Sequence, residues 1–355
     1  MPTISAPATV LVTGANGYIG LWTVFELLSR GYTVRGTVRS ASKVDALESL
    51  ISRKQPQAKD RFKGYVVEDI SADGAFDEAL KGADGVIHTA SPVSPDSEEP
   101  EAYSGPAVKG TVSILESALR SPSVQRAVIV SSMAATASAF VAPARTYTEE
   151  DWNEQAVTIV EEQGKNALSM LKYDASKVLA ERAAWDFYEK HKLEATYDLT
   201  MINPSWVFGP IADDTLPSPT SLPATPSHLF KMLFARPTPK ERFPECTNFV
   251  HVWDVATMLV RALELPEAGN ERIISNAFVS TWAQWLKANQ TLNLVPALDK
   301  VDLEEAEKPC PPHVYFANDK SKRIFGIEYR GVPETLVDVV DDFRTRGWLK
   351  HLEAY

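Results

Sequence analysis

The sequence is poor in cysteine, in positive charge and in long apolar runs. Its 355 residues include only two cysteines, Cys246 and Cys310, whose separation fits no metal-binding motif. This composition favours packing thiols in a reducing compartment over a disulfide framework, and it predicts no metal site. The formal net charge of -11 argues against nucleic acid or an anionic membrane as a partner, because both require Lys and Arg to meet phosphate.

The sequence shows no segment typical of a membrane span or a secretory signal. No apolar run reaches the roughly 18 residues that cross a bilayer. The opening stretch MPTISAPATVLVTG has no basic region before its short apolar run. We therefore expect a cytosolic protein. With 44% hydrophobic residues, the chain can bury a sizeable core, either as two domains or as one large α/β unit with an additional lobe.

A glycine-rich turn follows the first predicted strand. Residues 9 to 13 form a β-branched run, residues 14 to 20 read GANGYIG, and an apolar helical pattern continues from Leu21 to Leu28. Glycine in such a turn permits positive φ angles, brings a pyrophosphate close to the backbone and lets the helix sit near the strand. The helix N-terminus then offers N–H groups to the anion. The candidate cofactor contacts in this turn are Gly14, Asn16, Gly17, Tyr18, Ile19 and Gly20.

The residue after the second strand indicates which dinucleotide binds. This strand is predicted at residues 33 to 38, and Arg39 follows it where an NAD-specific site would place an acidic residue for the ribose hydroxyls. A guanidinium suits a 2′-phosphate instead. We therefore predict NADPH or NADP as the cofactor. Lys43 is a second candidate for that phosphate, with a solvent-facing position in the next helix as the alternative.

Strands and helices continue to alternate up to Ile202, which predicts an α/β fold with a doubly wound parallel sheet of the Rossmann type. Further strands are expected at residues 62–67, 85–90, 126–130 and 195–202, with helices near 75–80, 107–119 and 168–183. Ligands bind at the carboxyl ends of such strands. The candidate contacts at those ends are Asp69, Ile70, Ala90 and Pro204 for the cofactor and Ser132 for a substrate carbonyl. Asp69 as a plain helix cap is an equal alternative, and His88, inside an apolar strand, is predicted to be a core histidine.

A tyrosine and a lysine on one predicted helix are the candidate proton donor and its partner. In the run LKYDASKVLAERAAWDFYEK apolar residues recur at helical spacing, so Tyr173 and Lys177 lie one turn apart. An ammonium at that distance favours the phenolate, which makes the phenol a better general acid at neutral pH. The spacing alone is weak evidence, because about 0.6 matches are expected by chance among 11 tyrosines. A second match, Tyr188 with Lys192, lies in a charged helix end that is predicted to be solvated.

Nine prolines fall between Pro204 and Pro244 and are interleaved with aromatic residues. Proline removes the N–H donors of a strand, so this stretch cannot continue the sheet in order. We assign residues 1–203 to the dinucleotide-binding domain and 204–355 mainly to a smaller C-terminal substrate lobe. Residues 247–265 are expected to return to the first domain as a strand and a helix.

Together these motifs resemble those of the extended short-chain dehydrogenase/reductases, and within them the dihydroflavonol reductase-like group that includes cinnamoyl-CoA reductases and fungal or yeast carbonyl reductases. The matching segments, in the family's order, are VLVTGANGYIG, YTVRGTVRSASK, GVIHTASPV, VIVSSMAAT, YTEEDWNE, YDASKVLAERAAW, INPSWVFGP and FVHVWDVA. The resemblance implies the catalytic residues Ser132, Tyr173 and Lys177. It also implies a 2′-phosphate contact at Arg39 with Lys43 as a helper.

Two positions depart from the pattern of that group. Ala137 stands where plant flavonoid reductases have an asparagine that contacts the substrate, so a flavonoid substrate is not expected. Lys109 stands where relatives often carry an asparagine that helps to relay protons, so the relay to solvent is expected to differ.

The sequence therefore predicts an NADPH-dependent carbonyl reductase that acts, as a monomer or a homodimer, on a bulky and largely apolar small molecule. Ser132 would hydrogen-bond the carbonyl oxygen, Tyr173 would donate the proton, and Lys177 would hold the nicotinamide ribose and assist the phenol. Two alternatives remain open. A nucleotide-sugar epimerase or dehydratase uses a similar fold, although Arg39 and the apolar lobe count against it. A noncatalytic NADPH-sensing regulator would have no need of the Ser-Tyr-Lys set.

Overall fold

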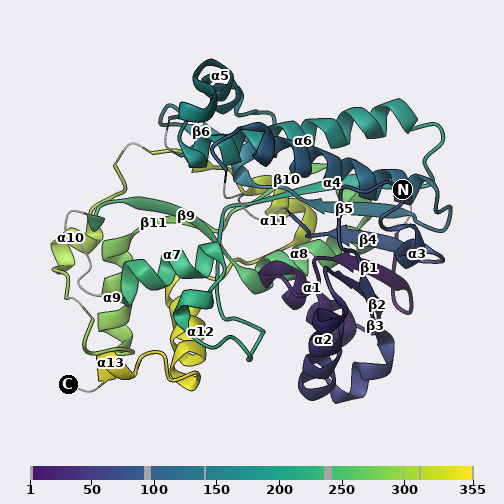
Figure 1. The fold of residues 1–355 in the computed structure, drawn as a ribbon. Coiled ribbons are helices and arrows are strands. Elements are labelled where there is room, and N and C mark those ends of the chain that lie inside the picture. The colour runs from purple at the N-terminus through teal and green to yellow at the C-terminus, as the bar shows by residue number, and fades with distance from the viewer. Residues whose placement is uncertain are drawn as a thin grey trace.

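The computed structural model describes residues 3–91, 97–139, 141–235, 242–298, 300–311 and 313–353, and its centre is a parallel sheet of seven strands (Figure 1). The strand order is β10-β7-β5-β4-β1-β2-β3. The strands are β1 (Thr9–Thr13), β2 (Thr33–Val38), β3 (Phe62–Val66), β4 (Gly85–His88), β5 (Arg126–Val130), β7 (Asp198–Pro204) and β10 (Arg272–Ser275). The order reverses between β1 and β4, which places the ligand crevice at the carboxyl ends of these two strands. The predicted doubly wound sheet is confirmed.

Helices cover both faces of this sheet (Figure 1). One layer contains α1 (Tyr18–Ser29), α2 (Ala41–Lys54), α8 (Val252–Glu264) and α11 (Asp319–Phe325), and the other contains α3 (Asp77–Leu80), α4 (Glu101–Leu119) and α6 (Ser169–His191). Because successive side chains of a strand point to opposite faces, Val10 and Val12 pack with the first layer and Leu11 with the second. The central strands of the sheet are thus buried on both sides, as their nearly continuous apolar sequences require, whereas the edge strand β3 is partly exposed.

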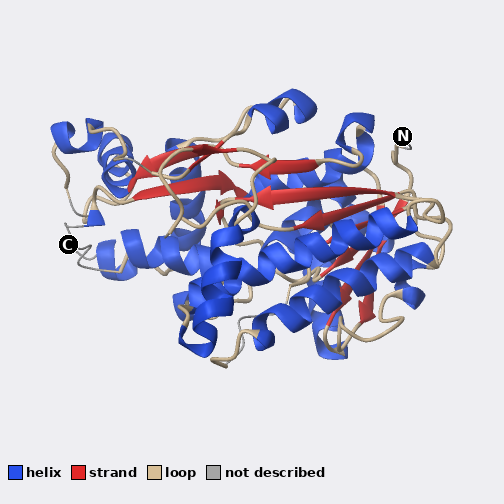
Figure 2. Ribbon diagram, turned by 90° about the horizontal axis from the view of Figure 1, so that it is seen from above, coloured by secondary structure: helices blue, strands red, loops and turns tan. Residues whose placement is uncertain are grey.

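The C-terminal lobe is built around a second, smaller sheet, which Figure 2 shows alongside the main one. Its strand order is β11-β9-β8, formed by β8 (Trp206–Phe208), β9 (Cys246–His251) and β11 (Phe278–Thr281). It packs with α7 (Ala224–Leu233), α9 (Trp282–Leu292) and α12 (Val332–Thr345) around a core that includes the buried rings of Phe208, Phe249, Trp285 and Phe343. The described chain also contains α5 (Glu154–Gln163), α10 (Leu303–Glu307), α13 (Lys350–Glu353) and a parallel pair of β6 (Thr146–Tyr147) with β12 (Tyr315–Phe316).

The return of the chain to the main sheet differs from the sequence expectation. Residues 247–265 were expected to return to the first domain as a strand and a helix. The strand in this region is β9, and it pairs with β8 and β11 in the lobe instead. It stays there because Phe249 packs edge-on against Trp285, with 5.0 Å between ring centroids, and stacks with Phe208. Helix α8 does return and covers the main sheet. The strand that joins the sheet is β10, a short, fully buried run that was not anticipated.

Helix α4 also begins earlier than the pattern predicts. It starts at Glu101 rather than near residue 107, and Pro106 lies inside it. Proline lacks the N–H of an interior helical bond, which normally ends a helix. Here burial of Tyr103 and Ala107 on either side of Pro106 holds the helix together across that position. Tertiary packing therefore overrides the local signal.

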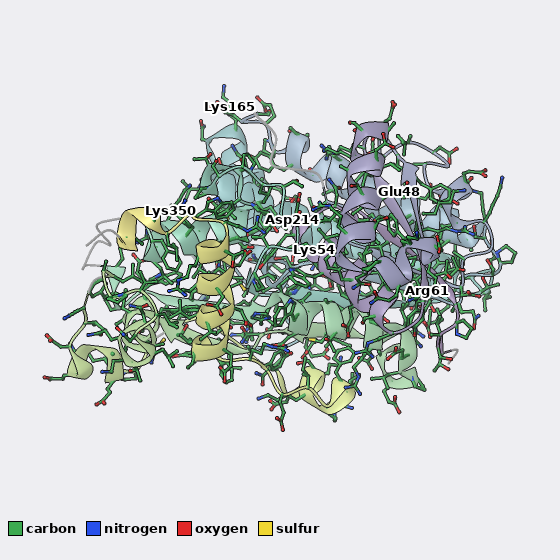
Figure 3. All side chains as sticks on the ribbon, turned by 90° about the horizontal axis from the view of Figure 1, so that it is seen from below. Glu48, Lys54, Arg61, Lys165, Asp214 and Lys350 are labelled. Atoms are coloured by element: carbon green, nitrogen blue, oxygen red, sulfur yellow. The ribbon has the colours of Figure 1, made fainter. Side chains whose placement is uncertain are left out.

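Two ion pairs and two hydrogen bonds join the lobe to the layer of α1 and α2 in the described part of the chain. Asp214 forms ion pairs with Arg53 and Lys54 of α2 at 3.1 and 3.0 Å. Figure 3 labels Lys54 and Asp214 next to each other. From α1, the Tyr18 hydroxyl donates to the carbonyl oxygen of Gly209 at 2.9 Å, and Trp22 Nε1 donates to that of Pro210 at 2.9 Å. The start of the lobe is therefore fastened to both helices.

Part of the predicted proline-rich stretch between Pro204 and Pro244 lies outside the described residues, because Pro237 and Pro239 fall in residues 236–241. Within the described residues, no helix combines the length and apolarity needed to cross a membrane.

Candidate active site

The glycine turn between β1 and α1 brings helix and strand into close contact. Gly14 has φ +62°, and a Cβ atom there would lie 2.9 Å from the Cα of Ala90. A Cβ atom at Gly20 would lie 2.3 Å from the carbonyl oxygen of Gly14. Real Cβ atoms do not come so close to backbone, so any side chain at either position would force the turn open. These glycines leave the backbone bare where a dinucleotide needs to approach it.

The first turn of α1 faces the same space. Gly17 caps the helix, and the first intrahelical bond is donated by Leu21 to the carbonyl of Gly17. The amides of Tyr18, Ile19 and Gly20 therefore have no carbonyl within the helix to bind. Together with the helix dipole they form a ready anion site. Tyr18 was predicted to contact the cofactor. Because its hydroxyl donates to the carbonyl oxygen of Gly209, its backbone amide is the donor that it can offer to an anion.

A cavity of about 230 Å³ lies between the glycine turn and the ends of β2 and β4. It brings together half of the predicted cofactor contacts, and its lining includes Gly14, Asn16, Gly17, Arg39, Lys43, Ile70 and Ala90. Arg39 and Lys43 are both exposed, and the side chain of neither forms an ion pair or a hydrogen bond with another described residue. Two cations without partners beside a helix N-terminus favour a phosphate-bearing ligand.

Asp69 is not part of that lining. It is exposed, and its carboxylate accepts a hydrogen bond from the amide of Ser71 at 2.8 Å. This is the capping role that the sequence left open, although it caps a turn rather than a helix. Ile70, the next residue, reaches the cavity instead.

The serine and tyrosine predicted for catalysis line a second cavity of about 170 Å³. Ser132 follows the end of β5, and Tyr173 projects from α6. The Ser132 hydroxyl accepts a hydrogen bond from the amide of Ala134 at 3.1 Å, so its own proton can be donated to a ligand. The lining also includes Ile19, Val130, Met133, Pro204, Trp206, Val207 and Thr225, and none of the described residues that line it is charged.

Lys177 lies beside Tyr173 and points toward the first cavity. Its Nζ atom is 5.6 Å from the centre of the Tyr173 ring and donates a hydrogen bond to Ser91 Oγ at 3.0 Å. Ser91 lines the cofactor cavity, so the ammonium bridges the two spaces. Sequence reasoning missed Ser91, although its position directly after Ala90 at the end of a strand could have indicated it.

His88 is close to this group but is not available for acid or base chemistry. Burial, together with the charge of Lys177, lowers the pKa of His88 to about 3. Its Nδ1 atom lies 2.9 Å from Thr13 Oγ1, and its ring contacts the edge of Phe76. It is a neutral core histidine, as the sequence pattern suggested.

The second Tyr-Lys pair has a different environment. Tyr188 is buried in the core behind β5 and β7, and burial raises the pKa of its phenol. Lys192 forms an ion pair with Glu189 at 2.9 Å on the helix surface. The expectation of a solvated pair is therefore right for Lys192 and wrong for Tyr188, whose ring faces the core. Because of this burial, the pair provides an internal control for the first.

The two departures from the resemblance lie away from the small cavity. Ala137 is buried in a cluster with Tyr147 and Phe316 and does not line the cavity of Tyr173. Lys109 is exposed on α4.

Comparison with known proteins places this geometry in a family. Residues 10–277 match the NAD dependent epimerase/dehydratase family, and the chain belongs to it. Aldehyde reductase 2 of Sporidiobolus salmonicolor is 34% identical over 281 residues, which cover 77% of this chain and 78% of the relative. Cinnamoyl-CoA reductase CAD2 of Medicago truncatula is 33% identical over 346 residues, covering 95% and 96%. The resemblance inferred from the motifs is confirmed.

Solved structures agree with this assignment. The yeast methylglyoxal/isovaleraldehyde reductase Gre2 complexed with NADPH superposes with a TM-score of 0.80 at 28% identity, covering 96% of this chain and 99% of that one. Gre2 of Candida albicans in complex with NADPH gives a TM-score of 0.83 at 28% identity, again covering 96% and 99%. Near-complete coverage of both chains means that the lobe as well as the sheet has a counterpart in these reductases.

Proposed function

We propose that this protein is an NADPH-dependent reductase that converts a ketone or an aldehyde into an alcohol. The proposal rests on the cavity that Ser132 and Tyr173 share, with the Lys177 ammonium beside the phenol ring. A hydroxyl, a phenol and an ammonium in one place are what carbonyl reduction needs to stabilise and protonate a developing alkoxide. The relatives named as reductases and the Gre2 structures with NADPH support this activity.

Each of the three side chains has a separate role in this proposal. Ser132 donates a hydrogen bond to the carbonyl oxygen, and Tyr173 gives the same oxygen its phenolic proton. Lys177 stabilises the phenolate that remains, and from its place beside Ser91, which lines the cofactor cavity, it would also hold the nicotinamide ribose. Bound NADPH would supply the hydride. The chain thus provides orientation and proton transfer.

The cofactor fits the first cavity by its chemistry. The bare backbone at Gly14 and Gly20 and the free amides of α1 suit a pyrophosphate, and Arg39 and Lys43 suit a 2′-phosphate. An NAD-specific epimerase would instead need an acidic group at Arg39. This supports a reductase over the nucleotide-sugar alternative.

Removing the Arg39 guanidinium should abolish most of the preference for NADPH. A charge-assisted hydrogen bond contributes about 1.5 to 3 kcal/mol, so Arg39→Ala should weaken NADPH binding by roughly tenfold to a hundredfold. NADH binding should stay the same, because NADH carries no 2′-phosphate. Fluorescence titration with both cofactors measures this, with Arg323→Ala, an exposed arginine on α11, as the control. A wild type that uses both cofactors equally well would contradict the assignment.

The substrate class follows from the second cavity and the lobe. The lining of the cavity is uncharged and mainly apolar, with hydroxyl groups among it, and it includes Trp206, whose ring stacks on His228 with 4.7 Å between centroids. Burial of an aryl or alkyl group there stabilises the complex by roughly 25 cal/mol per Å² of apolar area. We therefore propose neutral, bulky carbonyl compounds as substrates, held mainly by the C-terminal lobe.

The test of this function is a substrate panel. Aryl ketones, aliphatic and aryl aldehydes, keto esters, flavonoid ketones and nucleotide sugars are incubated with enzyme and NADPH, and the loss of NADPH absorbance is followed. We expect turnover with neutral aryl or alkyl carbonyl compounds and none with nucleotide sugars. Conversion of nucleotide sugars alone would favour an epimerase or dehydratase, and NADPH binding without any turnover would favour a regulator.

We also propose a cytosolic location and a monomeric or homodimeric state. Both cysteines of the chain are free thiols in the structure, which suits a reducing compartment. Localisation of the tagged protein in intact cells and its mass in solution test these two points.

A further inference from the structure

A buried carboxylate lies on the helix that carries Tyr173 and Lys177. Glu181 follows Lys177 by one turn of α6, and its side chain has no exposed surface. A carboxylate so far from water is stable only if its oxygen atoms are paired with donors. Neither the hydride step nor the proton step described above uses it.

Three donors from three strands converge on this carboxylate. Ser131 Oγ and Asn203 Nδ2 donate to Oε2 at 2.5 and 2.7 Å, and Arg272 Nε donates to Oε1 at 2.5 Å. Ser131 follows β5, Asn203 belongs to β7 and Arg272 begins β10. Glu181 therefore joins α6 to β5, β7 and β10, and its contacts with Ser131 and Asn203 lie next to residues that line the small cavity.

Two of these donors hold the backbone of Ser132. Ser131 precedes it directly, and the same Asn203 amide that binds Glu181 also donates to the carbonyl oxygen of Ser132 at 3.0 Å. The amide of Ser131 is bound in turn to the carbonyl of Ile202 at 2.8 Å. Asn203, which Glu181 binds, thus fixes the peptide group that follows Ser132, and Ser131, which Glu181 also binds, is the residue directly before it.

The third donor fixes the segment that follows Ser132. Arg272 Nη1 donates to the carbonyl oxygens of Glu149 and Asp151, each at 2.7 Å, and Nη2 donates to Thr136 Oγ1 at 3.1 Å. The guanidinium also lies over the Trp152 ring, 4.1 Å from its centre. Because all of these bonds need the guanidinium in one orientation, its ion pair with Glu181 orients the whole segment.

We propose that Glu181 is a positioning residue, which sets the geometry of Ser132 relative to Tyr173 through Ser131, Asn203 and Arg272. The inference rests on the proposed carbonyl reduction, in which the Ser132 hydroxyl must reach the oxygen that Tyr173 protonates. A carboxylate can accept from all three donors at once, whereas an amide at this position would place its own N–H groups against one of them. The positioning role of Glu181 therefore requires the negative charge of its carboxylate as well as the shape of the side chain.

Glu181→Gln should lower kcat by about tenfold to a hundredfold, since a misplacement of about 1 Å in an active site has effects up to that size. The NADPH dissociation constant should change by less than about threefold, because no residue that Glu181 binds lines the cofactor cavity. The matched control is Asp198→Asn, which removes a carboxylate buried at the opposite ends of β5 and β7, where Asp198 binds Arg126 at 2.5 Å. That variant should lose thermal stability but keep the kcat of the wild type. Equal kcat in the two variants would overturn the proposal.

A double mutant separates positioning from general damage. If Glu181 acts through Ser132, then Glu181→Gln should have almost no further effect on kcat in a Ser132→Ala background. Effects that multiply in the double mutant would contradict the proposal. Hydrogen exchange gives a readout that needs no substrate: the amides of Ser132 to Ala135 should exchange at least tenfold faster in Glu181→Gln and not in Asp198→Asn. Unchanged exchange at these amides would likewise refute it.

A smaller change covers the case in which Glu181→Gln does not fold. Ser131→Ala removes a single hydroxyl donor, and it should lower kcat several-fold with NADPH binding intact. Because Ser131 also lines the small cavity, the exchange of the amides of Ser132 to Ala135 is measured as well, and it should become faster in this variant. Thr200→Val removes a comparable buried hydroxyl from β7, bound to the carbonyl of Ala268 at 2.7 Å away from the site, and should leave kcat unchanged. Equal kcat in these two variants would also refute the proposal. Absence of turnover in the wild type would instead refute the proposed function, and the exchange measurement distinguishes the two failures.

Discussion

Tyr173→Phe is expected to reduce turnover by about a hundredfold to ten-thousandfold, which is the usual contribution of a positioned general acid. The substitution removes one oxygen atom from the wall of the small cavity and leaves the ring, the helix and the cofactor cavity in place. NADPH should therefore bind with nearly the affinity of the wild type. Turnover at saturating NADPH and a fluorescence titration provide the two measurements.

The chain contains its own control for this experiment. Tyr188→Phe makes the same chemical change at the same spacing from a lysine on the same helix, but in the core. It should alter turnover by less than about twofold, because the site lies elsewhere on the helix. Near-normal turnover in Tyr173→Phe with intact binding would refute the proton donor, and a collapse in Tyr188→Phe would mean that the other pair is catalytic.

Lys177→Ala should impair both NADPH binding and turnover. Its ammonium lies beside the phenol ring and donates to Ser91 of the cofactor cavity, so its loss would remove the charged hydrogen bond that we propose for the ribose as well as the charge that stabilises the phenolate. The first loss corresponds to about 1.5 to 3 kcal/mol, or roughly tenfold to a hundredfold in the dissociation constant. The fall in turnover at saturating NADPH comes in addition.

The control here is Lys192→Ala, which removes an ammonium at the helix surface that forms an ion pair with Glu189 and lies 5.8 Å from the centre of the Tyr188 ring, as Lys177 lies beside Tyr173. Surface ion pairs of this kind contribute little to the free energy of folding or binding. The NADPH dissociation constant and the turnover at saturating NADPH should therefore both stay within about twofold of the wild type. If Lys177→Ala weakened NADPH binding without lowering saturated turnover, its role would be confined to the ribose, and the assistance to Tyr173 would be withdrawn.

Much of the main sheet could be predicted because its signals are local. The β-branched run before the glycines and the run after Arg126 give β1 and β5 with the bounds that the structure has. Helix α4 and strand β9 were misjudged for a shared reason. In both cases a local pattern pointed one way, and buried contacts with distant residues, the packing around Pro106 and the stack of Phe249, decided otherwise.

The site shows the same division. Tyr173 and Lys177 are one turn apart on one helix, and Ser132 ends a strand, so spacing and periodicity suffice to nominate them. Glu181 and Arg272 carry no such signal. A Glu in the run LAERAAW looks like a solvated helix residue, and its partner lies on a short strand far along the chain. The partners in a buried polar network depend on which strands are adjacent in the sheet. The strand order that brings β10 next to β7 cannot be predicted from local patterns in a single sequence.

The bonds from Tyr18 and Trp22 to the lobe bear on how this protein could be re-engineered. Both donors are side chains of α1, but both acceptors are main-chain carbonyls, at Gly209 and Pro210. Every residue type has such a carbonyl, so the lobe can exchange the side chains that select a substrate without losing its attachment to the cofactor helix. Position 209 is the exception, because a Cβ atom there would lie 2.8 Å from Val252 at a φ of +139°. A designer who alters specificity therefore has freedom in the lobe and should leave Tyr18, Trp22 and Gly209 unchanged.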